Sequence, residues 1–271
     1  MQPVLSAINI YPVKSLGGIA LREAKVETRG LQYDRRWLLV DEEGTFITQR
    51  EYPRMALCSV RVTREGLEAS APGMKPLLIP FQPEHPAPVT VKIWRSICEA
   101  VRLGEFIDAW FSRFLGATLR LVYMTDETRR EVNPAYAVHA GDHVSFADGY
   151  PFNLLGESSF QDLNGRLATQ VPINRFRPNF VITGASAFEE DGWRKIRIGA
   201  TLFHVVKPCE RCQLTTIDQE TGERTGQEPL RTLAQYRTKN NGVLFGQYLI
   251  AEREGEMIRV GDEIEVMERK N

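Results

Sequence analysis

Two of the four cysteines form a C-x-x-C pair, Cys209 and Cys212, within the hexapeptide K-P-C-E-R-C. A cysteine thiolate is both a nucleophile and a ligand for soft metals. The positive charges of Lys207 and Arg211 beside the pair would favour the thiolate form. The hexapeptide is therefore the first candidate for metal or nucleophilic chemistry.

Three interpretations of this pair remain open from spacing alone. A structural zinc site needs two more closely spaced ligands, but Cys58 and Cys98 each stand alone in the sequence. A thioredoxin-like pair begins a helix, whereas residues 213–217 alternate like a strand. The pair is half of a zinc site, two inert core thiols, or a site in which one cysteine is a metal ligand or a nucleophile.

Other segments carry residue types that suit a phosphate group. Lys14 and Ser15 follow a strand-like run and precede two glycines, which supplies charge, donors and a backbone that a ligand can approach closely. Arginines stand beside aromatic or proline residues in Y-D-R-R-W, with Arg35, and in N-R-F-R-P-N, with Arg177 and Asn179. The plainer alternatives are a solvated lysine and buried ion pairs.

The composition is that of a globular chain, and it limits the class of partner. Hydrophobic residues make up 42% of the 271 residues, charged residues 25%, and the net charge is −1. No global basic field would attract nucleic acid or an anionic membrane, so a bound anion needs a local basic cluster. The N-terminus lacks an export signal and no apolar run is long enough to cross a bilayer. We expect a cytoplasmic protein with no nucleic-acid or membrane partner.

The elements that must position these residues are mainly strands, which gives a mixed α+β fold class that is predominantly β. Period-two alternation predicts strands at 4–10, 19–26, 36–41, 45–49, 56–62, 89–94, 118–124, 180–183, 195–198, 202–206, 213–217, 244–251 and 263–266. Helical spacing predicts helices near 104–115, 160–167 and 229–236. The proline-rich residues 72–88 indicate a surface excursion with edge strands. Residues 125–149 form a polar stretch that is long for a structureless loop, which favours a functional role.

Seven motifs, taken in order, resemble the MOSC family (molybdenum cofactor sulfurase C-terminal domain). They are Y-P-V-K-S, Y-D-R-R-W, F-A-D-G-Y-P-F, F-R-P-N-F-V-I-T-G, E-E-D-G-W, V-V-K-P-C-E-R-C-Q-L-T-T-I-D and L-F-G-Q-Y-L-I-A. Within the family, the chain is most similar to YcbX-like proteins and the mitochondrial amidoxime-reducing component. The resemblance implies a β-barrel-like domain at residues 1–103 and a MOSC β-barrel domain with a few helices at residues 104–271. The molybdenum cofactor (Mo-molybdopterin) would lie between the two.

The resemblance also implies roles for individual residues. Cys212 matches the cysteine that binds molybdenum, and Cys209 its non-ligating neighbour. Asp148 matches an acidic residue near the metal and is a candidate proton relay. Gly149 and Tyr150 depart from the Thr-Ser pair of the mitochondrial proteins, so pterin contacts made by those two hydroxyls do not carry over to this chain by match. The positions that match the pterin and phosphate contacts are Lys14, Ser15, Arg35, Arg177 and Asn179.

The implied activity is a molybdenum-dependent oxidoreductase that reduces N-hydroxylated compounds, such as hydroxylaminopurines, amidoximes and hydroxylamines, to amines. Many YcbX-like chains continue into a 2Fe–2S ferredoxin domain, whereas this sequence has no cysteine after Cys212. We therefore expect no iron–sulfur cluster in this chain and an external electron-donor protein of the ferredoxin or flavin-reductase type. The alternatives are a sulfur-transfer protein that carries a persulfide on Cys212, and a non-catalytic cofactor-binding or delivery protein.

Overall fold

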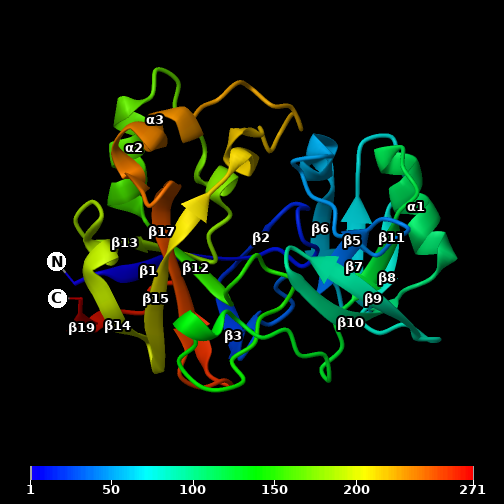
Figure 1. Ribbon diagram of the computed structural model, residues 1–271, viewed down its shortest axis with the longest axis horizontal. Helices are drawn as coiled ribbons and strands as arrows, with labels where there is room; N and C mark the ends of the chain where they lie inside the picture. Colours follow the sequence, from blue (N-terminus) through cyan, green and yellow to red (C-terminus); the bar gives the residue numbers. More distant parts are fainter. Residues whose placement is uncertain (1, 271) are drawn as a thin grey trace.

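The largest sheet of the structure, a computed structural model that describes residues 2–270, contains nine strands. Their order is β19-β14-β15-β17-β12-β13-β1-β2, with β16 beside β17. The strands are β1 (Val4–Ile10), β2 (Ile19–Leu21), β12 (Phe152–Gly156), β13 (Phe180–Thr183), β14 (Trp193–Ile198), β15 (Thr201–Arg211), β16 (Thr238–Lys239), β17 (Gly242–Ala251) and β19 (Ile264–Arg269). Strands from both ends of the chain thus share one sheet, and both termini lie on the same side of the molecule (Figure 1).

A second lobe, on the right of Figure 1, combines two smaller sheets with helix α1 (Glu105–Leu115). One sheet has the order β5-β11-β10-β9 and the other the order β6-β7-β8. Their bounds are β5 (Trp37–Val40), β6 (Ser59–Val62), β7 (Gly66–Ser70), β8 (Leu77–Pro80), β9 (Ala87–Ile93), β10 (Ser96–Arg102) and β11 (Arg120–Tyr123). The edge position of β8 confirms the edge strand expected in the proline-rich segment. A further small sheet has the order β18-β3-β4, with β3 (Glu23–Glu27), β4 (Gly30–Leu31) and β18 (Met257–Arg259).

Helix α1 forms as its apolar spacing predicts and buries one face against these sheets. Ile107, Trp110, Phe111 and Phe114 join the core of the second lobe. Phe106, on the same helix, lies outside this core with 79% of its surface exposed. The other two α-helices in the described residues, α2 (Glu157–Arg166) and α3 (Leu230–Arg237), also occupy the predicted regions. The fold is therefore mixed α+β and predominantly β, as predicted.

The two lobes do not follow the chain in consecutive halves. β1 pairs with β13 and so belongs to the nine-stranded sheet, whereas β11 pairs with β5 in the second lobe. Helix α1 packs in that lobe as well. The packing lobes thus differ from the predicted units 1–103 and 104–271, and that division of the chain stays a prediction.

Two predicted strands do not form, because side chains bind the local backbone instead. Residues 213–217 contain a 3₁₀ helix, η5 (Gln213–Thr216), in which Thr215 and Thr216 hydroxyls donate to the carbonyls of Cys212 and Gln213. Residues 45–49 form only isolated β-bridges. The chain then turns at Thr48, whose N–H donates to the Glu51 carboxylate and whose hydroxyl accepts from the N–H of Arg50. Hydrogen bonds of this kind compete with strand pairing. No helix among residues 2–270 is long and apolar enough to cross a membrane.

Candidate functional site

One recess between the lobes brings together segments that lie far apart in the sequence. Because β1 and β13 are antiparallel, the segment after β1 lies beside the segment that precedes β13. β12 runs parallel to β13, so the segment before β12 arrives at the same place. All seven residues predicted for the site line this recess: Lys14, Ser15, Arg35, Asp148, Arg177, Asn179 and Cys212.

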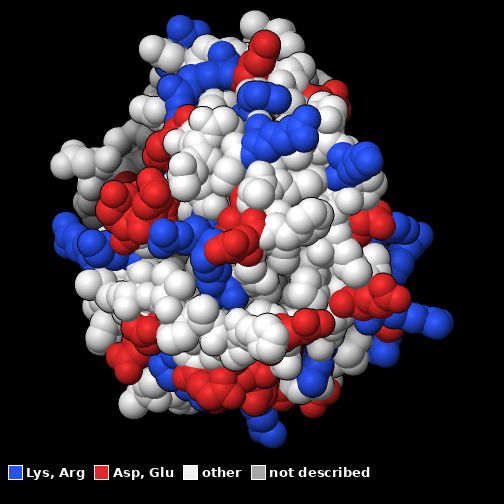
Figure 2. All heavy atoms as spheres, turned by 90° about the vertical axis from the view of Figure 1, so that its right-hand side faces the viewer, with Lys and Arg blue, Asp and Glu red and all other residues white. Residues whose placement is uncertain are grey.

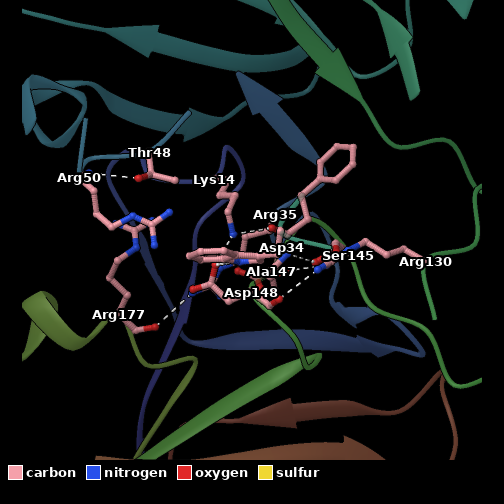
Figure 3. Close-up of polar contacts among 12 residues, drawn as sticks. Lys14, Asp34, Arg35, Thr48, Arg50, Arg130, Ser145, Ala147, Asp148 and Arg177 are labelled. Carbon is pink, nitrogen blue, oxygen red and sulfur yellow. Dashed lines mark hydrogen bonds and ion pairs between the residues drawn. The ribbon is translucent and has the colours of Figure 1, made fainter. Parts of the chain in front are cut away.

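Lys14 and Asp148 form an ion pair on the wall of the recess (Figure 3). Lys14 Nζ lies 2.7 Å from Asp148 Oδ1 and also donates to the carbonyl of Phe146 at 2.8 Å. Burial lowers the pKa of Lys14 to about 8, although the carboxylate beside it acts in the opposite direction. Burial would also raise the pKa of Asp148, but Lys14 and the indole N–H of Trp94 together hold that pKa well below its usual value. Asp148 is thus ionised at neutral pH, and the pKa of Lys14 lies close to neutrality.

A buried arginine fixes the segment that presents this carboxylate. Arg130 Nη1 donates to the carbonyls of Ser145 and Ala147, at 2.8 and 2.6 Å, and Nη2 donates to the carbonyl of Asp148 at 3.0 Å. The chain around Asp148 is irregular, so these hydrogen bonds replace those of a sheet. Arg130 falls within residues 125–149, where the length of the loop had indicated function, but nothing in the sequence singled out Arg130 itself.

Arg35 and Arg177 belong to one connected polar network. Arg35 pairs with Asp34 at 2.7 Å and donates to the carbonyl of Arg177 at 3.2 Å. Both guanidinium groups also pack on the ring of Tyr11, 4.4 and 4.1 Å from its centroid. Lys14, Arg35 and Arg177 are therefore brought to one place, as the family resemblance implied.

Arg177 differs from its neighbours because its guanidinium makes no hydrogen bond to the described part of the chain. Its Nη2 is buried and without a partner. Burial, and secondarily the nearby charge of Arg35, lowers the pKa of Arg177 to about 10, which leaves it cationic at neutral pH. A buried unpaired donor is costly, so this group is suited to an anionic ligand, while Arg35 serves to position it.

The recess concentrates positive charge that the overall composition does not reveal. Its walls carry two carboxylates, Asp148 and Glu210, and six basic side chains: Lys14, Arg35, Arg50, Arg175, Arg177 and Arg211. On the outer face of the second lobe, by contrast, Lys and Arg are interspersed with Asp and Glu (Figure 2). A local cluster of this kind is what a near-neutral chain needs to hold an anion.

Three of these basic residues were not predicted for the site. Arg175 pairs with Asp218 at 2.7 Å, and Arg211 donates to the carbonyls of Phe245 and Phe176. Both belong to motifs already noted in the sequence. Their closeness in sequence to Arg177 and Cys212 is the signal that could have identified them as site residues. Arg50 directly follows residues 45–49, which were wrongly expected to be a strand, and it points into the recess from the second lobe (Figure 3).

The two cysteines of the C-x-x-C pair lie in different environments. Cys209 is part of β15 and only 2% exposed, and burial raises its pKa. Cys212 directly follows β15 and is exposed, at the start of η5. No disulfide links cysteines in the structure. Cys212 is therefore the accessible thiol of the recess.

The recess has the features that a molybdenum cofactor requires. An exposed cysteine offers a soft ligand to the metal, and the basic cluster with the unpartnered Nη2 of Arg177 offers donors to a phosphate. Arg177 pairs with no carboxylate among the described residues and is the basic residue best placed for that phosphate. Arg50 comes next, since it lies 3.7 Å from Glu51, whereas Lys14, Arg35 and Arg175 pair with carboxylates at 2.7 Å.

Comparison with known proteins identifies the family. Residues 2–118 match the MOSC N-terminal beta barrel domain, and residues 140–265 match the MOSC domain. Mitochondrial amidoxime-reducing component 1 of Mus musculus is 36% identical, over 94% of this chain and 79% of the relative. Mitochondrial amidoxime reducing component 2 of Rattus norvegicus is 34% identical, over 96% of this chain and 82% of the relative.

A solved structure, the YUAD protein of Bacillus subtilis, aligns over 97% of this chain and 94% of its own, with a TM-score of 0.44 and 11% identity. The assignment depends on the domain matches and on the curated relatives. The chain belongs to the MOSC family, and the mitochondrial amidoxime-reducing components are among its relatives.

Proposed function

We propose that this protein is a molybdenum-cofactor-dependent reductase that converts N-hydroxylated compounds to amines. Amidoximes, hydroxylamines and hydroxylaminopurines are the candidate substrates. The observation that supports this most directly is a single recess that holds both the exposed Cys212 and the basic cluster around Arg177. The names of the relatives point to the same type of reaction.

Residues of the recess divide into those that would hold the cofactor and those that would serve the substrate. Cys212 is the proposed metal ligand, and Arg177 and Arg50 the proposed phosphate contacts. Ser15 and Asn179 line the same wall. When bound, the cofactor supplies a metal centre that exchanges two electrons with the substrate.

The reaction needs two protons as well as two electrons, because the N–O bond is broken and its oxygen leaves as water. The electrons would come from an external donor protein of the ferredoxin or flavin-reductase type. Lys14 Nζ is the proposed proton donor, since burial brings its pKa to about 8 and it lies in the recess. Asp148 remains ionised, so its role becomes that of an acceptor that holds Lys14 and orients donor groups of the substrate.

Metal analysis and turnover test this proposal together. The protein is purified from a host that makes the cofactor, and reduction of benzamidoxime is followed with reduced methyl viologen as electron donor. Stoichiometric molybdenum and pterin with turnover are the expected result. Cys212→Ala should lose both metal and activity, whereas Cys209→Ala should retain the metal. The reverse pattern in the two variants would overturn the choice of ligand.

The exposure of Cys212 is also compatible with a second function, transfer of sulfur as a persulfide. Cyanide-labile sulfur without molybdenum would favour this carrier over the reductase. Bound cofactor without turnover of any N-hydroxylated substrate would instead indicate a binding or delivery protein.

A further inference from the structure

Trp94 occupies an unusual position at the rim of the recess. It lies in the turn between β9 and β10, has a φ of 55°, and is 53% exposed. A bulky residue rarely adopts this left-handed conformation, which favours glycine or asparagine. The other three tryptophans, Trp37, Trp110 and Trp193, are buried. Because Trp94 is exposed, packing of the core does not explain why a tryptophan occupies this strained position.

Three contacts fix the indole in place. Its Nε1 donates to Asp148 Oδ1 at 3.2 Å. The guanidinium of Arg50 lies 4.3 Å from its ring centroid, and the ring of Phe46 lies 5.1 Å away at a tilt of 57°. Asp148 and Arg50 themselves line the recess. These contacts hold the indole beside the site, with Arg50 over one face of the ring, while about half of the surface of the residue stays exposed.

Asp148 has a free hydrogen-bond acceptor beside the indole of Trp94. Its Oδ1 accepts from both Lys14 and Trp94, whereas its Oδ2 has no hydrogen bond to the described residues. A rigid aromatic face next to a free carboxylate oxygen matches a flat ligand that carries N–H donors at its edge.

We propose that Trp94 and Asp148 together select planar N-hydroxylated substrates, which stack on the open indole and donate an N–H to Asp148 Oδ2. The inference rests on the proposed function and names the substrate class within it. Amidoximes and N-hydroxylated aminopurines are planar and carry such donors, whereas aliphatic hydroxylamines lack an extended π face. Stacking of a flat ring on an aromatic side chain is worth about a tenfold change in affinity or more.

Two substitutions distinguish the contribution of the indole ring from that of the backbone turn. Trp94→Gly removes the ring and suits a φ of 55°, so the turn loses no stability through strain. Trp94→Phe keeps an aromatic face but loses the N–H donor. Phe106→Ala, at an exposed aromatic residue of α1 that does not line the recess, is the matched control.

Kinetics with two substrates provide the first measurement. For benzamidoxime, Trp94→Gly should raise KM about tenfold, Trp94→Phe should recover most of that loss, and Phe106→Ala should match the unmodified protein. For N-methylhydroxylamine, the loss of kcat/KM in Trp94→Gly should be about tenfold smaller than the loss for benzamidoxime. Equal losses for both substrates, or no loss for benzamidoxime, would overturn the proposal.

Tryptophan fluorescence gives a second readout that needs no turnover. Benzamidoxime added to the cofactor-loaded protein should quench the emission saturably, and this quenching should disappear in Trp94→Phe, because the remaining tryptophans are buried. Saturable quenching without turnover in the unmodified protein would refute the reductase and support the recognition site. Turnover with neither quenching nor a KM effect in Trp94→Gly would refute the recognition site alone.

Discussion

At the scale of single residues, the four cysteines differ mainly in their burial. Cys58, Cys98 and Cys209 are 0%, 7% and 2% exposed, and burial raises the pKa of Cys58 to about 12. Cys212 is exposed. Because the thiolate is the reactive form, cofactor-free native protein should react with DTNB rapidly at one thiol. Cys212→Ser should abolish this fast phase and Cys209→Ser should leave it intact, whereas guanidinium should expose all remaining thiols. A fast phase that persists in Cys212→Ser would contradict this assignment.

The Lys14–Asp148 pair leads to a prediction about pH. Lys14 has a pKa of about 8 and is the proposed acid, so kcat for benzamidoxime should be highest below that pH and fall as pH rises through it. Asp148→Asn removes the charge that favours the ammonium form, which should move the fall to lower pH. Lys14→Arg should reduce kcat and remove the step near pH 8, since arginine stays protonated.

The pH profiles must be normalised to the molybdenum content of each variant, because Lys14 was also predicted to contact the cofactor. A profile of the unmodified protein that is flat between pH 7 and 9 would exclude Lys14 as the acid. An unchanged profile in Asp148→Asn would show that the carboxylate does not control the Lys14 proton.

At the scale of elements, sequence patterns predicted what depends on periodicity and missed what depends on individual side-chain hydrogen bonds. The apolar stripe of α1 and the alternation of β3 correspond to burial on one face, and the residue pattern shows this directly. The run 213–217 alternates in the same way, yet threonine hydroxyls bind the backbone there and form η5. Arg50 was missed for a related reason, since its position follows from the turn at Thr48 and no motif includes it.

The irregular segment around Asp148 should depend on Arg130 for its order. Arg130→Met would leave three backbone carbonyls, two of them buried, without their donor, which we expect to cost about 1–3 kcal/mol of folding free energy. Hydrogen exchange should accelerate in peptides that cover residues 145–150 more than elsewhere. Arg129→Met, at the exposed neighbouring arginine, is the control and should change neither quantity. Uniform acceleration over the whole chain would point to a global effect instead.

At the scale of the whole molecule, the site exists only because both lobes contribute to it. The second lobe supplies Arg50 and Trp94, and the segments that border the nine-stranded sheet supply Arg177 and Cys212. The resemblance to the MOSC family implied that Lys14, Arg35 and Arg177 meet, because all three match its pterin and phosphate contacts. The sequence could not indicate the net positive charge of the recess, because the chain as a whole has a net charge of −1.

Clustered positive charge should make the cofactor-free protein less stable than the loaded one. Six basic side chains line the recess, and the guanidinium of Arg177 pairs with no carboxylate among the described residues. A bound anion supplies that missing partner, and it also favours the folded state by mass action. The loaded protein should therefore unfold at a Tm several degrees higher, measured by calorimetry at matched ionic strength. Arg177→Ala should reduce the difference because it removes the unpartnered donor, whereas Phe106→Ala should preserve it. Equal Tm values for the two forms, at stoichiometric molybdenum in the loaded sample, would mean that the basic cluster does not hold the cofactor.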